Sequence, residues 1–377
     1  MQNKIDFNKT YAVALGGGGA KGGYEVGVWR SLNEEGLKYN AVSGTSVGAL
    51  NGALMAMRDL EKAEELWRNI RYSDVMDVDN TAMTKLFEGE ISKFDLIGTV
   101  RRAIGIVRDG GFDVTPLREL LKRTVDVGKL KASDVAFYIV TYSLTDKKEL
   151  DLDVKTLPDD QICDMLLASA YFPAFKNEPL SGGKRFTDGG VSDSLPVTPL
   201  IMNGYKDIIA VRLKGSLGRE KRVKVPDGTT VHYIEPKRKL GSTLNFSPSQ
   251  ANYNMQLGYF DAKRYVYDLI GERYYLYRTM TEKEAYLELM PFVEDYARHN
   301  SIRASLRDLH ETVIPKFAKS HGASGDYYDI LVKYMEHSGE VFNIPEFRLI
   351  SDRQLLDEVK AAVANNIAQC PGESNGA

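Results

Sequence analysis

Residues 11–57 constrain the fold more than any other part of this 377-residue chain. They indicate, in order, a strand, a glycine-rich loop, a helix, a second strand and a second helix: Tyr11–Leu15, 16–23, Tyr24–Glu35, Tyr39–Ser43 and Val47–Met57. Two short apolar strands joined by one helix are typical of a β–α–β unit, in which the strands run parallel. Because parallel sheets are covered on both faces, the sequence predicts a buried, mostly parallel sheet.

The junction between the second strand and its helix is Gly44-Thr45-Ser46-Val47-Gly48. A turn that lifts a side chain off the end of a strand needs tight backbone angles, and a Cβ at Gly44 or Gly48 would collide with neighbouring chain. Ser46 then stands at a helix N-terminus, where free N–H groups and the helix dipole favour developing negative charge. Gly-x-Ser-x-Gly in this place is the pattern of a nucleophile elbow. Taken alone, it fits equally well a turn of small residues that happens to carry a serine.

The glycine-rich loop after the first strand, Gly17–Gly22, fits G-x-G-x-x-G, which usually indicates dinucleotide binding. That interpretation needs an acidic residue at the end of the next strand. Glu34 and Glu35 come too early, and Ser46 occupies the strand end instead. The N–H groups of such a loop can also converge on the oxyanion of an acyl transfer, and Lys21 would add positive potential there. Loop and elbow follow two strands linked by one crossover, so we expect both at the carboxyl edge of the sheet.

A third element is Asp188, which ends a short strand and precedes Gly189 and Gly190. Asp-Gly-Gly is a common turn. An aspartate at a strand end, followed by two flexible residues, can also be aimed at a serine hydroxyl. The chain has five histidines, and His232 is the one that follows Asp188 within the α/β part. Two schemes therefore remain open: a Ser46–Asp188–His232 triad in a general carboxylesterase, or direct proton transfer from Ser46 to Asp188.

Four segments resemble the patatin-like phospholipases in both order and spacing: 16–22 (GGGGAKG), 44–54 (GTSVGALNGAL), 169–175 (SAYFPAF) and 187–196 (TDGGVSDSLP). The resemblance covers roughly residues 11–213. It implies a three-layer α/β sandwich and a catalytic dyad instead of a triad. The family often has an asparagine a few residues after the Asp-Gly-Gly, where this chain has Asp193-Ser194.

By this resemblance Ser46 is the nucleophile, Asp188 is the proton acceptor, and the N–H groups of Gly17, Gly18 and Gly19 form the oxyanion hole. The implied reaction is the hydrolysis of fatty-acyl esters of phospholipids or lysophospholipids through an acyl-serine, as in lipid degradation. No cofactor or metal is needed by this scheme. The alternatives are a nucleotide-binding protein that uses the Gly17–Gly22 loop, and a non-catalytic lipid-binding protein, against which the intact serine and aspartate argue.

Composition limits the partners and the compartment. The net charge of -3 gives no global attraction to nucleic acid. Two cysteines, Cys163 and Cys370, indicate a reducing compartment without structural disulfides. Residues 1–10 lack an apolar signal-peptide core, and no apolar run approaches the roughly 20 residues that span a bilayer. We therefore expect a cytoplasmic protein whose contact with a membrane is peripheral.

Further strands are predicted at Val135–Leu144, Glu149–Val154, Arg185–Thr187, Asp207–Leu213 and Thr230–Ile234, the first two forming a hairpin. After residue 278 the strand pattern ends and only helical patterns remain. We therefore expect a leader at 1–10, a catalytic α/β domain at 11–213, an extension of it at 214–278 and a helical C-terminal region at 279–377.

Residues 74–112 carry isolated apolar side chains among charged ones. Short helices over the open end of the sheet are predicted there, as a candidate lid or acyl channel. Met76 and other apolar residues up to residue 106, together with Tyr171 and Phe172, are the candidate lining of that channel.

Overall fold

The computed structural model describes residues 4–88, 111–215, 218–302 and 305–369. The chain divides into two compact units between Tyr265 and Val266. The C-terminal region was predicted to start at residue 279, and the division between the two units comes before that residue. The finer domain ranges remain a prediction.

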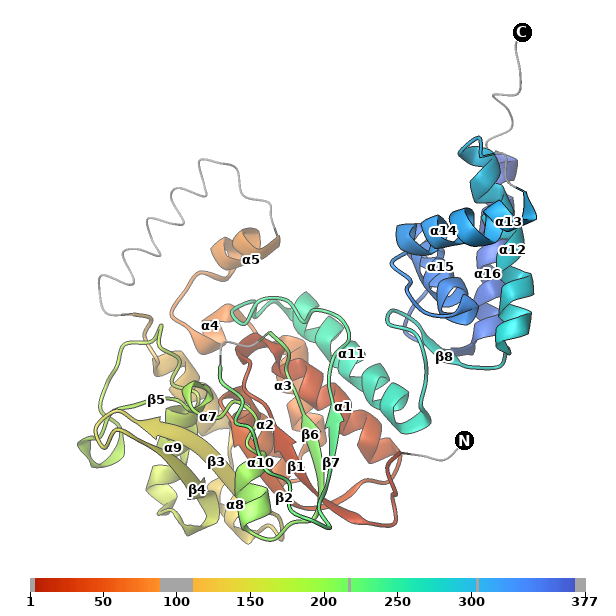
Figure 1. Ribbon diagram of the computed structural model, residues 1–377. Helices are drawn as coiled ribbons and strands as arrows, with labels where there is room; N and C mark the ends of the chain where they lie inside the picture. The colour runs from red at the N-terminus through yellow and green to blue at the C-terminus, as the bar shows by residue number, and fades with distance from the viewer. Residues whose placement is uncertain (1–3, 89–110, 216–217, 303–304, 370–377) are drawn as a thin grey trace. The chain divides into compact units, whose positions relative to one another are not determined.

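The first unit contains a sheet that has seven strands within the described residues, in the order β4-β3-β2-β1-β6-β7, with β5 also paired to β3 (Figure 1). The strands are β1 Thr10–Leu15, β2 Lys38–Thr45, β3 Ala136–Ser143, β4 Lys148–Asp153, β5 Phe186–Asp188, β6 Asp207–Val211 and β7 Thr230–Ile234. The pairs among β3, β2, β1, β6 and β7 are parallel, whereas β4 and β5 run antiparallel to β3. The prediction of a mostly parallel sheet with one hairpin is confirmed.

Helices cover both faces of this sheet, which makes three layers. One face carries α2 (Val47–Ala56) and α9 (Ile162–Ser169), which pack on β2 and β3. Outside α2 lie α1 (Gly23–Glu34) and α3 (Leu60–Asn69), and α11 (Pro248–Tyr267) packs along α1. The opposite face carries α10 (Val197–Met202), whose Val197 and Leu200 pack on small and branched side chains of β1, β2 and β6. A three-layer α/β sandwich was the expectation from the family resemblance, and the fold agrees with it.

Most predicted elements in this unit are displaced by only one or two residues at their ends. The strand predicted to reach Leu213 stops at Val211, because its partner β1 ends at Leu15, opposite Val211. Helix α9 is preceded by a separate 3₁₀ turn at Asp159–Gln161. A short helix, α8 (Val127–Ala132), was not predicted.

The segment predicted as a lid or acyl channel begins with α4 (Tyr72–Val75) and α5 (Asn80–Glu88). The rest of it, residues 89–110, lies outside the described residues, including the predicted lining residues Ile91, Phe94, Leu96 and Ile97. The described chain resumes before α7 (Thr115–Thr124).

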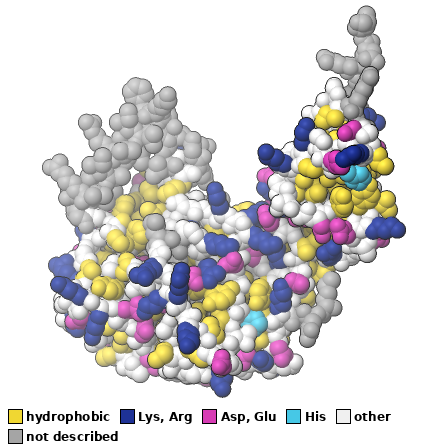
Figure 2. Space-filling model, viewed as in Figure 1, with side chains coloured by type: hydrophobic (Ala, Val, Ile, Leu, Met, Phe, Trp, Pro, Cys, Tyr) yellow, Lys and Arg dark blue, Asp and Glu magenta, His cyan; other side chains and the backbone are white. Residues whose placement is uncertain are grey.

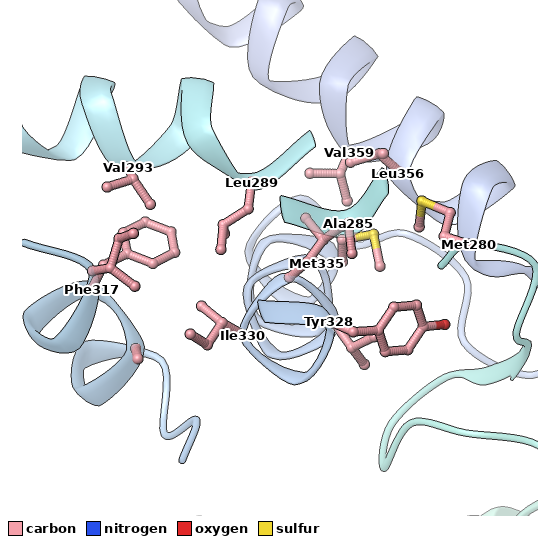
Figure 3. Packing of buried hydrophobic residues seen from close by; sticks show 14 of the residues in the cluster. Met280, Ala285, Leu289, Val293, Phe317, Tyr328, Ile330, Met335, Leu356 and Val359 are labelled. Carbon is pink, nitrogen blue, oxygen red and sulfur yellow. The ribbon is translucent and has the colours of Figure 1, made fainter. Parts of the chain in front are cut away.

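The second unit is helical, as predicted. Its helices are α12 Glu282–His299, α13 Leu306–Asp308, α14 Ile314–Ser320, α15 Tyr327–Val341 and α16 Asp352–Gln369. Figure 3 shows Leu289 and Val293 of α12 directed toward Phe317 and Ile330 in its core. The expectation that strands end near residue 278 is wrong in one respect, because β9 (Leu349–Ser351) pairs with β8 (Tyr275–Tyr277). Strands of three residues are too short to show an alternating pattern.

Two properties bear on partners. In the part of the chain that the structure describes, no helix is both long and apolar enough to cross a membrane. On the face seen in Figure 2, Lys and Arg side chains of the first unit are spread among acidic ones and do not gather into one basic surface.

Candidate active site

The pairing pattern around β3 brings two distant segments together. β2 pairs with β3 as far as Thr45, opposite Val140, while β4 occupies the other edge of β3. β5 pairs with the next residues of β3, with Asp188 opposite Thr141. Because β4 already fills one edge, β5 lies on the edge that β2 has left. Ser46, which follows β2, therefore meets Asp188 at the end of β5.

The turn at Ser46 is strained. Its φ is 56° and its ψ is -125°, a region that residues with a Cβ rarely adopt. A Cβ at Gly44 would lie 2.2 Å from the carbonyl oxygen of Gly48, and one at Gly48 would lie 2.3 Å from that of Leu15. Both flanking positions therefore require glycine, for the steric reason expected from the sequence.

Ser46 and Asp188 are in direct contact. The Ser46 hydroxyl donates a hydrogen bond to Asp188 Oδ2 at 2.5 Å, and Asp188 Oδ1 accepts the N–H of Gly190 at 2.8 Å. Ser46 and Asp188 are only 8% and 7% exposed. Burial raises the pKa of Asp188 to about 6, and the hydrogen bonds from Ser46 and Gly190 oppose that rise. A carboxylate of this kind is ionised at neutral pH yet is a stronger base than an exposed one.

The glycine loop lies beside Ser46, but its three N–H groups are not equivalent. The N–H of Gly17 donates to the carbonyl oxygen of Ser194 at 2.7 Å and is therefore occupied. The N–H groups of Gly18 and Gly19 have no acceptor among the described residues. Gly19 has a φ of 57°, and a Cβ there would lie 2.4 Å from the carbonyl oxygen of Thr243. Of the three predicted oxyanion donors, Gly18 and Gly19 are the two that remain available.

Lys21 does not take the place that the sequence suggested. Its side chain is buried, and Nζ donates to the carbonyl oxygens of Lys214 at 3.1 Å and Gly215 at 2.5 Å. Burial lowers the pKa of Lys21. The lysine fastens the chain after β6 and is not one of the described residues that line the cavity next to Ser46. Gly22 is buried at the end of the same loop.

His232 lies away from Ser46 and Asp188. It belongs to β7, which is separated from β2 by β1 and β6. Its Nδ1 is 3.0 Å from the hydroxyl of Tyr265, and its ring packs edge-on against Tyr11. Burial lowers the pKa of this imidazole. Within the described residues the structure therefore brings Ser46 to Asp188 without His232.

A large apolar cavity opens beside Ser46 and Asp188. The space among its lining residues, together with the open solvent at its mouth, is about 1120 Å³. Gly17, Gly18, Gly19 and Gly190 line it together with Ser46 and Asp188, whereas helices α2, α3, α4 and α7 supply most of the apolar wall. Representative lining residues are Leu50, Leu54, Leu66, Val75, Met76, Leu117, Leu121, Phe172 and Phe246. An apolar wall of this size suits a hydrocarbon chain and not the pyrophosphate of a dinucleotide.

The predicted lining of this cavity was partly right. Met76 and Phe172 do line it, but the hydroxyl of Tyr171 donates to the carbonyl of Lys176 and accepts the N–H of Glu178, away from the cavity. The contributions of α7 and of residues 243–246 were not predicted. The leucines of α7 have the spacing of any helix that faces a core, so sequence alone does not separate a cavity wall from a filled interior.

Asp193, where the sequence departs from the pattern expected from the resemblance, is buried and has no hydrogen bond to the side chain of Ser46 or Asp188. Its Oδ1 accepts the N–H of Leu195 at 3.2 Å and of Lys221 at 3.5 Å, and its Oδ2 has no partner among the described residues. Burial raises the pKa of Asp193 to about 7. The backbone carbonyl of Asp193 accepts the hydroxyl of Thr45 at 2.9 Å, so its main chain supports the elbow whatever the side chain.

Comparison with known proteins indicates which family this chain resembles. The family model described as patatin-like phospholipase matches residues 13–201. Lysophospholipase NTE1 of Kluyveromyces lactis is 26% identical over 268 residues, which is 67% of this chain and 16% of that protein. The patatin-like phospholipase domain-containing protein ZK370.4 of Caenorhabditis elegans is 54% identical over 53 residues, which is 14% of this chain and 4% of that protein. The chain thus spans only a small part of the length of these curated relatives.

Among solved structures, VipD from Legionella pneumophila is similar with a TM-score of 0.44 at 14% identity. The similarity covers 96% of this chain and 88% of that one.

Proposed function

Because the chain belongs to the patatin-like phospholipase family, we propose that it hydrolyses fatty-acyl esters of phospholipids or lysophospholipids through a dyad of Ser46 and Asp188. The observation that supports this most is the 2.5 Å hydrogen bond between these two side chains, both of which line an apolar cavity. A serine hydroxyl needs a base to remove its proton as it attacks. Asp188 is the base in contact with it.

In the acylation step, Ser46 Oγ attacks the ester carbonyl carbon while its proton passes to Asp188 Oδ2. The carbonyl oxygen becomes negatively charged and accepts hydrogen bonds from the free N–H groups of Gly18 and Gly19. When the tetrahedral intermediate collapses, the bond to the alcohol breaks and the protonated Asp188 donates its proton to the leaving alkoxide. The products of this step are the free alcohol and an ester of Ser46.

In the deacylation step, water attacks the carbonyl carbon of acyl-Ser46. Asp188 accepts a proton from that water, and the same two glycine N–H groups stabilise the oxyanion again. The bond to Ser46 Oγ then breaks, Asp188 returns the proton to Ser46, and a fatty acid leaves. Residues of this chain and one water supply every group in the cycle.

The cavity supports a lipid acyl chain as the substrate group that is recognised. Its wall is mostly apolar, and Ser46, Asp188 and the glycine loop are among the residues that line it. When the ester carbonyl lies beside Ser46 and its hydrocarbon chain lies along the wall, apolar surface is removed from water. This burial stabilises the bound substrate by roughly 25 cal/mol per Å². The alcohol part of the ester would then extend toward the open mouth.

The first test is covalent labelling. A fluorophosphonate probe should modify Ser46 in the wild-type protein, and the Ser46→Ala variant should neither react nor release fatty acid from a panel of phospholipids and lysophospholipids. Modification of a different serine, or equal turnover by Ser46→Ala, would contradict the proposal.

The second test separates Asp188 from the other buried carboxylate nearby. Asp188→Asn removes the proton acceptor and should lower kcat by at least about 100-fold. Asp193→Asn is the matched control, because Asp193 is also buried and has no hydrogen bond to Ser46. Equal losses in both variants would show that Asp188 acts only through the fold.

A further inference from the structure

Ser169 links the nucleophile to the centre of the sheet. This residue ends α9 and is fully buried. Its hydroxyl oxygen accepts the backbone N–H of Ser46 at 3.0 Å and donates its own proton to the carbonyl oxygen of Val140 at 2.7 Å. One hydroxyl therefore uses both its donor and its acceptor capacity to hold the elbow against β3.

The turn that follows Ser169 also holds the other member of the dyad. The backbone N–H of Asp188 donates to the carbonyl oxygen of Tyr171 at 2.8 Å. The turn itself is fastened to β3, because the hydroxyl of Thr141 donates to the carbonyl oxygen of Ala168 at 2.9 Å. Residues 168–171 thus hold both Ser46 and Asp188 by their backbone amides.

Ser46 needs such a contact because its backbone is strained. At a φ of 56° its N–H is not part of the hydrogen bonds of α2, and it is buried at the end of β2. A strained conformation persists only where its surroundings supply compensating contacts. Without the Ser169 hydroxyl, the buried N–H would lose its acceptor, and rotation of the peptide toward a relaxed geometry would move Ser46 Oγ away from Asp188.

We propose that Ser169 is a positioning residue, whose hydroxyl holds the strained backbone of Ser46 so that Ser46 Oγ points at Asp188. This inference rests on the proposed function, because it assigns Ser169 a part in that reaction. Ser169 acts through the Ser46 amide and does not touch the reacting atoms. It also keeps the Ser46 N–H out of the oxyanion hole, which leaves that task to Gly18 and Gly19.

The test compares Ser169→Ala with a matched variant, Ser43→Ala. Ser43 is also fully buried, lies on β2 and donates its hydroxyl to the carbonyl oxygen of Pro196 at 2.6 Å. Each variant removes one buried hydroxyl that donates a hydrogen bond to a backbone carbonyl oxygen, but only the Ser169 hydroxyl also accepts the Ser46 N–H. Steady-state kinetics with a short-chain nitrophenyl ester, the rate of fluorophosphonate labelling and the thermal midpoint are measured for both variants and for Ser46→Ala.

We expect kcat and the labelling rate of Ser169→Ala to fall together by about 10- to 100-fold, with KM changed by less than about threefold. Ser43→Ala should keep kcat within about twofold at a similar loss in thermal midpoint. Wild-type kcat in Ser169→Ala, or an equal loss of kcat in Ser43→Ala, would overturn the positioning role while Ser46→Ala remained inactive. Activity in Ser46→Ala would instead remove the proposed function itself.

If Ser169→Ala does not fold, Ser169→Cys decides the question. A thiol fills the same place but is a weaker hydrogen-bond acceptor than a hydroxyl. The same fall in kcat at nearly constant KM supports the proposal, and wild-type kcat overturns it.

Discussion

Lowering the pH from 8 to 5 should reduce kcat/KM about tenfold, because Asp188 accepts a proton only in its ionised form. Burial raises the pKa of Asp188 from the ordinary 3.8 to about 6. This rise of about two pH units corresponds to about 3 kcal/mol in favour of the protonated acid. One pH unit below its pKa, about a tenth of the protein carries the ionised base, so activity is lost as the pH falls through about 6.

The assay is kcat/KM for a short-chain nitrophenyl ester between pH 4.5 and 8.5, with circular dichroism at each pH to verify that the protein stays folded. Asp193 is the necessary control, because burial raises its pKa to about 7 and it titrates in the same range. Asp193→Asn should leave the midpoint at about 6. A midpoint near 4, or one that disappears in Asp193→Asn, would refute the assignment of this titration to Asp188.

Three further outcomes are expected. Asp193→Asn should raise the free energy of unfolding at pH 8 by as much as about 4 kcal/mol and change it little at pH 4. The reason is that the pKa of Asp193 is about 7 in the folded protein against an ordinary 3.8, so the ionised carboxylate destabilises the folded state above pH 7. Equal effects at both pH values in urea unfolding would contradict this. Gly19→Ala should lower kcat about 100-fold, because its Cβ would lie 2.4 Å from the carbonyl oxygen of Thr243 and displace an oxyanion donor. Gly36 also has a positive φ but has open space around it, so Gly36→Ala should only lose stability. His232→Ala should keep kcat/KM within about twofold, and a large loss would restore the triad hypothesis.

Local sequence was sufficient to predict the elbow and the sheet around it. The strand–helix–strand order of residues 11–45 already determines a parallel pair. Gly44 is required by its contact with Gly48 inside the turn, and Gly48 by its contact with Leu15 at the end of the paired strand. The contact between Ser46 and Asp188 was also expected, although its catalytic role stays a proposal. These features depend on short-range backbone geometry and on the rule that connects successive parallel strands.

Other features of the site depend on chain segments that are far apart in sequence. The N–H of Gly17 is occupied because Ser194 folds back against it, and Lys21 is buried because residues 214 and 215 supply its acceptors. Neither contact leaves a pattern in the sequence near the glycine loop. The part of the loop that remains free for an oxyanion was therefore visible only in the folded chain.

By itself, the sequence determined the strained serine turn, the glycine loop beside it and the parallel sheet that carries both, because these follow from local sterics and strand connection. Only the tertiary structure decided which residues hold Ser46 in place, which N–H groups stay free and which side chains wall the cavity. Ser169 reaches both Ser46 and Val140 only after β3 and α9 have packed against the elbow. Such contacts join residues separated by many positions, and side-chain type alone does not reveal them.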